Sequence, residues 1–141
     1  MNNTDVRVAL RTALSSDPEL VALLSAPTAV YHRTAPQSAR EPLVIFAKSS
    51  GIEVLAFKDG GFKDQLWTVK GVCRGGDAEQ AEAIDDRCAE LLQNAELDIS
   101  GGRTLSLFRV SDVDYGEGDK GADQIHHVGG IYRLAIEEEG S

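Results

Sequence analysis

The stretch Leu66-Trp-Thr-Val-Lys-Gly-Val-Cys73 and the helical segment that follows Gly75-Gly76 decide the fold that this sequence predicts. Trp67, Val69 and Cys73 share one face at a period of two residues, which is typical of a strand. The segment after the glycines repeats apolar residues every three or four positions, as one stripe of a helix does: Ala81, Ile84, Cys88, Leu91 or Leu92, and Ala95. A second strand from Arg103 to Val110 follows, so the flanking strands form the sheet that buries this stripe.

Two details of this helix are predicted from its sequence. Asp77 is expected to be the N-cap, because Gln80 follows at the spacing of a capping box. Leu91 is expected to pack between helix and sheet, so that Leu91→Ala would cost about 2–5 kcal/mol of folding free energy.

The rest of the chain adds helices at the N-terminus and further strands. Apolar spacing predicts two short helices or one bent helix before Pro27, restarted at Asp17-Pro18. Strands are expected at residues 30–32, 43–47, 52–57 and 125–136, and the 103–110 strand continues to residue 115. A charged turn at 58–64 is expected to make a hairpin with Phe62 at its tip, and 116–124 a polar loop.

These elements predict one α+β domain of residues 1–141 in the order α-α-β-β-β-β-α-β-β. Its sheet is mixed and mostly antiparallel, with the helices packed on a face. Leu105 to Val110 is expected to contain a bulge or to be buried on both sides, because its apolar face switches between Leu107 and Phe108.

The charge balance limits the partners of this protein. The net charge is −9, which argues against nonspecific affinity for the DNA backbone and for anionic membranes. The sequence has neither a basic, apolar secretory leader nor a stretch of about 20 apolar residues, so we expect a soluble protein made in a cytoplasm. Its two cysteines, Cys73 and Cys88, are expected to be reduced.

No catalytic, cofactor-binding or metal-binding residue is predicted. His126 and His127, near Asp112, Asp114 and Asp123, form the only cluster of metal-ligand types. Neighbouring residues of a strand point to opposite faces, so a solvated loop is favoured over a metal site. Both cysteines fall on buried stripes, where thiols are unreactive. The paired glycines lack the spacing of a phosphate-binding loop.

Several segments together resemble the tail terminator, or tail completion, proteins of long-tailed bacteriophages. The resemblance covers nearly the whole chain as a pattern of residue types. It runs through Leu10 to Leu24, Val30-Tyr-His-Arg-Thr-Ala-Pro36, Pro42-Leu-Val-Ile-Phe46, Ala81 to Leu92 with the Leu97 segment and Gly101, and His126-His-Val-Gly-Gly-Ile-Tyr-Arg-Leu-Ala-Ile136. The chain departs from the family in a longer 49–64 region and in the 116–124 loop.

The resemblance implies a structural virion protein without an active site, assembled in the host cytoplasm. Such proteins form a ring, expected to be a hexamer, on the head-proximal end of the tail tube. The ring ends tube polymerisation and joins the tail to the neck and head-tail connector proteins. DNA passes through its lumen without specific binding, which the acidic composition suits because like charges repel.

We expect the 58–64 turn and the 112–124 segment to reach the tube or neck partners. The residues predicted for these contacts are Lys58, Asp59, Phe62, Lys63, Asp112, Asp114, Tyr115 and Asp119. Deleting residues 59–63 should leave the fold intact and abolish joining. Alternatives are another neck component, such as a head completion or adaptor protein, a small metal-dependent enzyme using His126 and His127, and a monomeric binding module of the host.

Overall fold

The computed structural model describes residues 2–54, 62–119 and 121–139. Its elements follow one another as α1 (Asn3–Ser15), α2 (Pro18–Ala22), β1 (Val30–His32), β2 (Leu43–Val54), β3 (Phe62–Arg74), α3 (Glu79–Leu92), β4 (Gly102–Glu117) and β5 (Ile125–Glu138). The five-stranded sheet has the order β1-β2-β3-β5-β4. β1 is parallel to β2, and the other pairs are antiparallel. The predicted α+β class is confirmed.

One strand of the predicted order is merged with its neighbour. The strands expected at 43–47 and 52–57 form the single strand β2, which ends at Val54, and residues 55–57 lie outside the described residues. The polar segment Lys48 to Gly51 interrupts the apolar pattern but not the pairing, because Ser50 and Gly51 still face Leu66 and Gln65 of β3. A register shift between Lys48 and Ser50 absorbs the irregularity.

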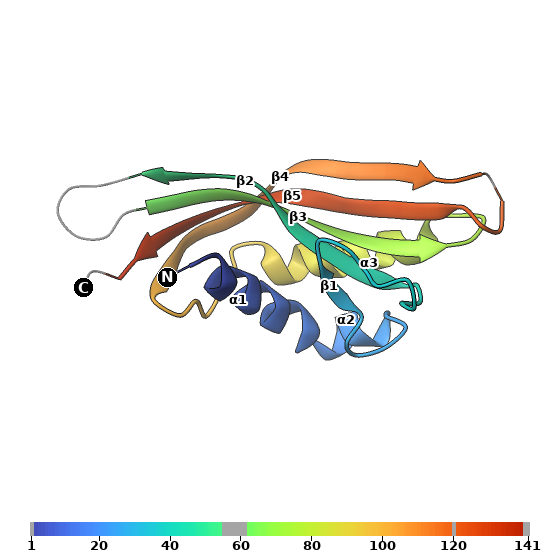
Figure 1. The fold of residues 1–141 in the computed structure, drawn as a ribbon, viewed down its shortest axis with the longest axis horizontal. Helices are drawn as coiled ribbons and strands as arrows, with labels where there is room; N and C mark the ends of the chain where they lie inside the picture. Colours follow the sequence, from blue (N-terminus) through green and yellow to red (C-terminus); the bar gives the residue numbers. More distant parts are fainter. Residues whose placement is uncertain (1, 55–61, 120, 140–141) are drawn as a thin grey trace.

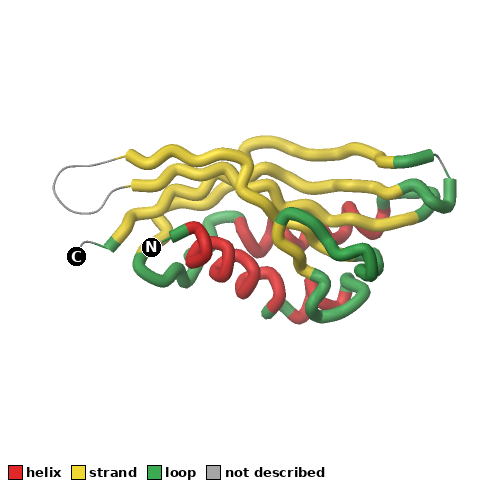
Figure 2. The backbone as a smooth tube through the Cα atoms, in the orientation of Figure 1, coloured by secondary structure: helices red, strands yellow, loops and turns green. Residues whose placement is uncertain are grey.

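The molecule has two layers, with the helices on one face of a long twisted sheet (Figures 1 and 2). The core lies between them and contains the stripe predicted for α3 together with residues of α1 and of the sheet: Val6, Leu10, Leu14, Phe46, Trp67, Val69, Ile84, Cys88, Leu92, Tyr132, Leu134 and Ile136. Leu92 is fully buried, whereas Leu91 only packs at the margin of this cluster. The side chain expected to fill the helix–sheet core is therefore that of Leu92.

Side-chain caps fix the starts of α1 and α2. At α3 the cap differs from the one that the sequence predicts. Asn2 and Asp5 form a capping box at α1, and the Asp17 carboxylate accepts from the Leu20 N–H at α2. The predicted capping box of α3 is wrong, because its N-cap is Ala78. Asp77 instead accepts a hydrogen bond from the Glu79 N–H at 3.0 Å.

Strand β4 is an edge of the sheet and carries two irregularities. Its register against β5 shifts between Thr104 and Ser106 and again between Arg109 and Ser111. The residues inside these shifts, Leu105 and Val110, have no opposite residue on β5 and are 43% and 46% exposed. The expected bulge is thus present at two places that flank the predicted one, and it leaves apolar side chains at an open edge.

Candidate interaction surfaces

The residues predicted for partner contacts lie at opposite ends of the sheet. Phe62 starts β3 and faces Glu137 near the end of β5, whereas Tyr115 near the end of β4 faces His127 near the start of β5. Figure 1 shows these ends at the two extremes of the long axis. The structure therefore does not bring the predicted residues together into one surface. Lys58 and Asp59 lie outside the described residues.

At the first end, Phe62 belongs to a strand rather than to a hairpin tip. It pairs with Val54 of β2 and with Glu137 of β5, and its side chain is 36% exposed. Lys63 forms an ion pair with Glu138 at 3.2 Å. The Asp64 carboxylate accepts hydrogen bonds from Arg133, and this contact lowers the pKa of Asp64. This end therefore presents an exposed aromatic ring beside paired charges.

At the other end, Tyr115 is held by two neighbouring side chains. Its ring stacks on His127 with centroids 4.4 Å apart, and its hydroxyl accepts a hydrogen bond from Lys70 at 2.7 Å. His127 Nε2 lies 2.8 Å from a Glu117 carboxylate oxygen. Burial is the main cause that lowers the pKa of His127, so its neutral form is favoured. Asp112, Asp114 and Asp119 are exposed along the same end.

The two histidines do not converge. His126 lies 2.9 Å from the Gly75 carbonyl oxygen, whereas His127 contacts Tyr115 and Glu117 on the other face of β5. Among residues 2–54, 62–119 and 121–139, no group of three potential metal ligands occurs. Cys73 and Cys88 are buried and free, and burial raises the pKa of the Cys88 thiol to about 12. No helix in the described part of the chain is long and apolar enough to cross a membrane.

A cationic edge beside β1 is a surface that the sequence patterns did not single out. We define it by Arg7 and Arg11 of α1, Arg33 and Lys48. Within the described residues, none of these four side chains forms an ion pair. Burial, together with the charges of Arg7, Arg33 and Arg11, lowers the pKa of the adjacent His32. The local potential is therefore positive on a chain whose net charge is −9.

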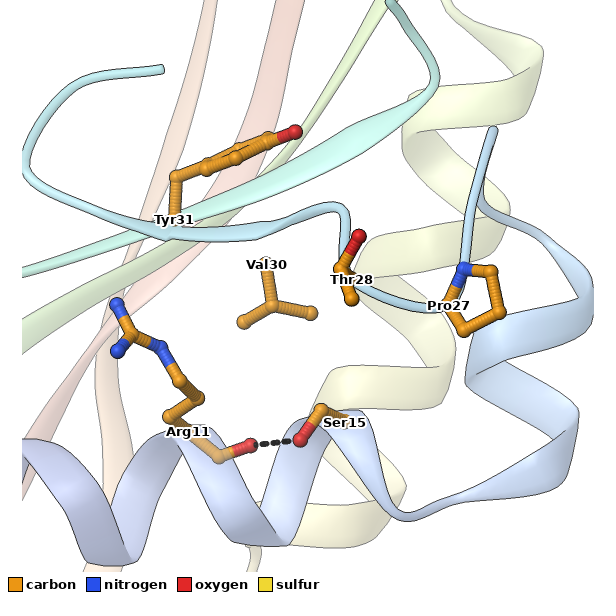
Figure 3. A pocket seen from close by; sticks show the side chains of 6 residues that line it. All are labelled: Arg11, Ser15, Pro27, Thr28, Val30 and Tyr31. Carbon is orange, nitrogen blue, oxygen red and sulfur yellow. Dashed lines mark hydrogen bonds between the residues drawn. The ribbon is translucent and has the colours of Figure 1, made fainter. Parts of the chain in front are cut away.

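Two hollows open along this cationic edge. One, of about 300 Å³, is lined by Asn3, Arg7, His32, Arg33, Lys48 and Trp67. The other, of about 460 Å³, lies between α1 and β1 and is lined by Arg11, Ser15, Pro27, Thr28, Val30 and Tyr31. Figure 3 shows the Arg11 guanidinium beside Val30 and Tyr31 at the second hollow, with the Ser15 hydroxyl donating to the Arg11 carbonyl oxygen at 2.7 Å.

Arg33 has an unusual backbone. Its φ is 72°, in the left-handed region that residues other than glycine avoid. Its N–H donates to the Phe46 carbonyl oxygen at 2.9 Å, which fixes the turn that ends β1. The spacing of four residues between Arg7 and Arg11 places both on one side of α1, and this spacing was the signal for the cationic edge in the sequence. Only the fold brings Arg33 and Lys48 next to these two arginines.

Comparisons with known proteins agree with the fold. A sequence model of the family described as tail completion protein gp17 matches residues 8–133. A chain from the virion of a native gene transfer agent (GTA) particle has a TM-score of 0.73 at 20% identity, with 94% of each chain covered. A second solved structure has a TM-score of 0.57 at 14% identity, covering 100% of this chain and 98% of that one. At such identities both show a shared fold alone. No curated protein sequence gives a significant match.

The family match defines a structural component of a virion tail. The match spans most of the chain. This protein belongs to the tail completion protein gp17 family.

Proposed function

We propose that this chain forms a ring, a hexamer, that caps the head-proximal end of the tail tube, ends tube polymerisation and joins the tail to the neck. The observation that carries the proposal is the match of residues 8–133 to a tail completion family. A ring of identical subunits needs two different lateral surfaces on each chain. The open edges β1 and β4 of the sheet are suited to that use.

The two ends of the sheet are suited to two further partners. In a ring whose subunits share lateral edges, the strand ends face the two rims. We propose that the Phe62 end and the Tyr115 end contact different proteins, one the tube and the other a neck or head-tail connector protein. Both ends carry a partly exposed aromatic ring, 36% for Phe62 and 46% for Tyr115, and aromatic residues are enriched in protein interfaces.

The acidic composition supports a lumen through which DNA moves without binding. A net charge of −9 per chain gives a ring a strongly negative field. Such a field leaves the DNA backbone few binding sites, because stable contacts with phosphate require Lys and Arg.

The test mixes the purified chain with polymerised tube protein and images the tubes by negative-stain electron microscopy. We expect a ring with sixfold symmetry at one tube end, and no elongation from that end when more tube protein is added. Tubes that elongate equally from both ends in the presence of the chain would contradict the proposal. Binding to purified neck or portal assemblies but not to tubes would instead indicate a head completion or adaptor protein.

The two rims can be tested separately in the same assay. Phe62→Ala and Tyr115→Ala should each leave the ring intact, and one should lose tube capping while the other loses neck joining. Leu23→Ala is a matched control, because Leu23, the C-cap of α2, is 38% exposed and belongs to neither strand end. If neither substitution changes capping or joining, the assignment of the two ends is wrong.

A further inference from the structure

We propose that neighbouring copies join through oppositely charged sheet edges, the cationic edge of one subunit contacting the acidic edge of the next. The acidic edge is defined by Asp112 and Asp114 of β4. This inference rests on the proposed ring and names its subunit interface. It follows from the charges, from the strand register and from the exposed apolar side chains beside each edge.

The acidic edge is exposed and only partly paired. The Asp112 side chain is 83% exposed and contacts Arg109 of its own strand at 2.9 Å. Asp114 is exposed and forms no ion pair with any described residue. Both carboxylates can therefore accept hydrogen bonds from guanidinium groups of a neighbouring chain.

The register places the two edges at the same level along the strands. His32 of β1 faces Phe46, which faces Val69, then Gly130 and finally Asp112 of β4. Two residues along, the same path leads from Val30 through Val44, Gly71 and Val128 to Asp114. Copies related by rotation about an axis along the strands would thus bring β1 of one chain to Asp112 and Asp114 of the next.

The charged groups also lie on the same face of the sheet. Arg109, next to Asp112, reaches Asp85 of α3, so this side of β4 is the side that the helices cover. Side chains two residues apart share a face, and Asp114 is therefore on that side as well. The cations Arg7 and Arg11 come from α1, on the same layer. A flat edge-to-edge approach therefore aligns opposite charges rather than placing them on opposite faces.

Apolar side chains accompany the charges at both edges. Val8, which follows Arg7 in α1, is 51% exposed. On β4, the bulged residue Val110 is 46% exposed and lies two residues before Asp112. Burial of these side chains would supply the hydrophobic part of the contact, while the charges set its register and polarity.

The test reverses the charge of each edge in a separate variant. One variant carries Arg7→Glu and Arg11→Glu, and the other carries Asp112→Lys and Asp114→Lys. Each alone should weaken self-association at least tenfold, measured by sedimentation velocity and by the share of tube ends that carry a ring. An equimolar mixture should restore assembly, because native and charge-swapped contacts then alternate around the ring.

Control variants distinguish an effect of the edge residues from a general effect of the changed net charge. Arg40→Glu and Asp98→Lys change exposed residues outside both edges, and they should assemble as the wild type does. Arg33→Gly removes a cation and relieves the left-handed backbone, so it should weaken assembly without lowering thermal stability. If circular dichroism shows that the double variants do not fold, the single variants Arg33→Gly and Asp114→Lys take their place.

Each outcome decides the inference. Rings formed equally well by both reversed variants would overturn this interface and leave the ring proposal standing. Loss of assembly that the mixture does not restore would show that the two edges do not contact each other. A wild-type chain that stays monomeric at high concentration and on tube ends would overturn the ring, and the interface with it.

Discussion

The Arg109 guanidinium and the Asp85 carboxylate form two parallel hydrogen bonds, of 2.7 and 3.1 Å. Arg109 also donates to the Gly129 carbonyl oxygen at 2.7 Å and lies 5.9 Å from the centre of the Tyr132 ring. The contact ties edge strand β4 to helix α3. It is a planar, bidentate pair of the kind that lysine cannot reproduce.

We predict that Arg109→Leu destabilises the fold by about 3–5 kcal/mol, because it leaves the Asp85 carboxylate buried without its partner. Asp85 is 7% exposed, so water cannot fully replace the guanidinium. Arg103→Leu is the matched control, since its pair with Glu137 is solvent-exposed and exposed pairs contribute about 0–1 kcal/mol. Urea melts measure both, and equal losses would contradict the buried role of Arg109.

A second prediction concerns the glycine that makes room for this arginine. A Cβ at Gly130 would lie 2.6 Å from the Arg109 Cζ atom. Gly130→Ala should therefore displace the guanidinium and cost about 1–3 kcal/mol, as overpacking does. Gly76→Ala adds a Cβ with no heavy atom within 4 Å and should change stability little. A thermal melt in which the two variants unfold together would count against this packing.

The third prediction corrects the leucine chosen from the sequence. Leu92→Ala should cost about 2–5 kcal/mol, because the fully buried side chain leaves a cavity under the sheet. Leu91→Ala should cost clearly less, since Leu91 is only partly buried at the edge of the core. Denaturant melts of the two variants give the comparison, and a larger loss for Leu91 would reverse the assignment.

The fourth prediction concerns pH. Burial lowers the pKa of His127 and of His32 below the usual 6.5, so the unfolded chain binds more protons than the folded chain just below that value. The free energy of unfolding should then fall as the pH drops from about 6.5 toward the lowered pKa values of the folded state. His127→Gln should flatten this dependence, and His32 should supply the remainder.

The measurement is a series of urea melts between pH 7.5 and pH 5, at roughly constant ionic strength to hold screening fixed. His126→Gln is the control, because that ring bonds a backbone carbonyl on the other face of the strand. A His127→Gln profile as steep as that of the wild type would show that His127 does not carry this linkage.

The helices of the fold were predictable because their signals are local. The N-cap of α2 follows from Asp17 and Pro18, and the apolar stripes of α1 and α3 follow from a spacing of three or four residues. The prediction of two separate strands at 43–47 and 52–57 was wrong, because strand pairing continues through a segment whose residues do not form a strand pattern. Lys48 to Gly51 lacks an apolar pattern, yet β3 extends beside it and supplies the missing hydrogen bonds.

Some of the candidate surfaces were predictable from the sequence, and one was visible only in the fold. Exposed Phe62 and the charged 112–119 segment were predicted from composition, but their separation to opposite ends depends on the pairing of β3 and β4 with the same strand. The cationic edge was not predicted, because Arg7, Arg33 and Lys48 are distant in the sequence and meet only at the hollow beside β1.

The sequence by itself determined the α+β class and the helix faces, since these depend on the periodicity of neighbouring residues. Its segments also carried the resemblance to the tail completion family. Only the tertiary structure decided which strands are edges, where the bulges turn Leu105 and Val110 to solvent, and that β1 and Asp112 share one level of the sheet. Strand order and register arise from contacts between residues far apart in the chain, so local residue spacing does not predict them.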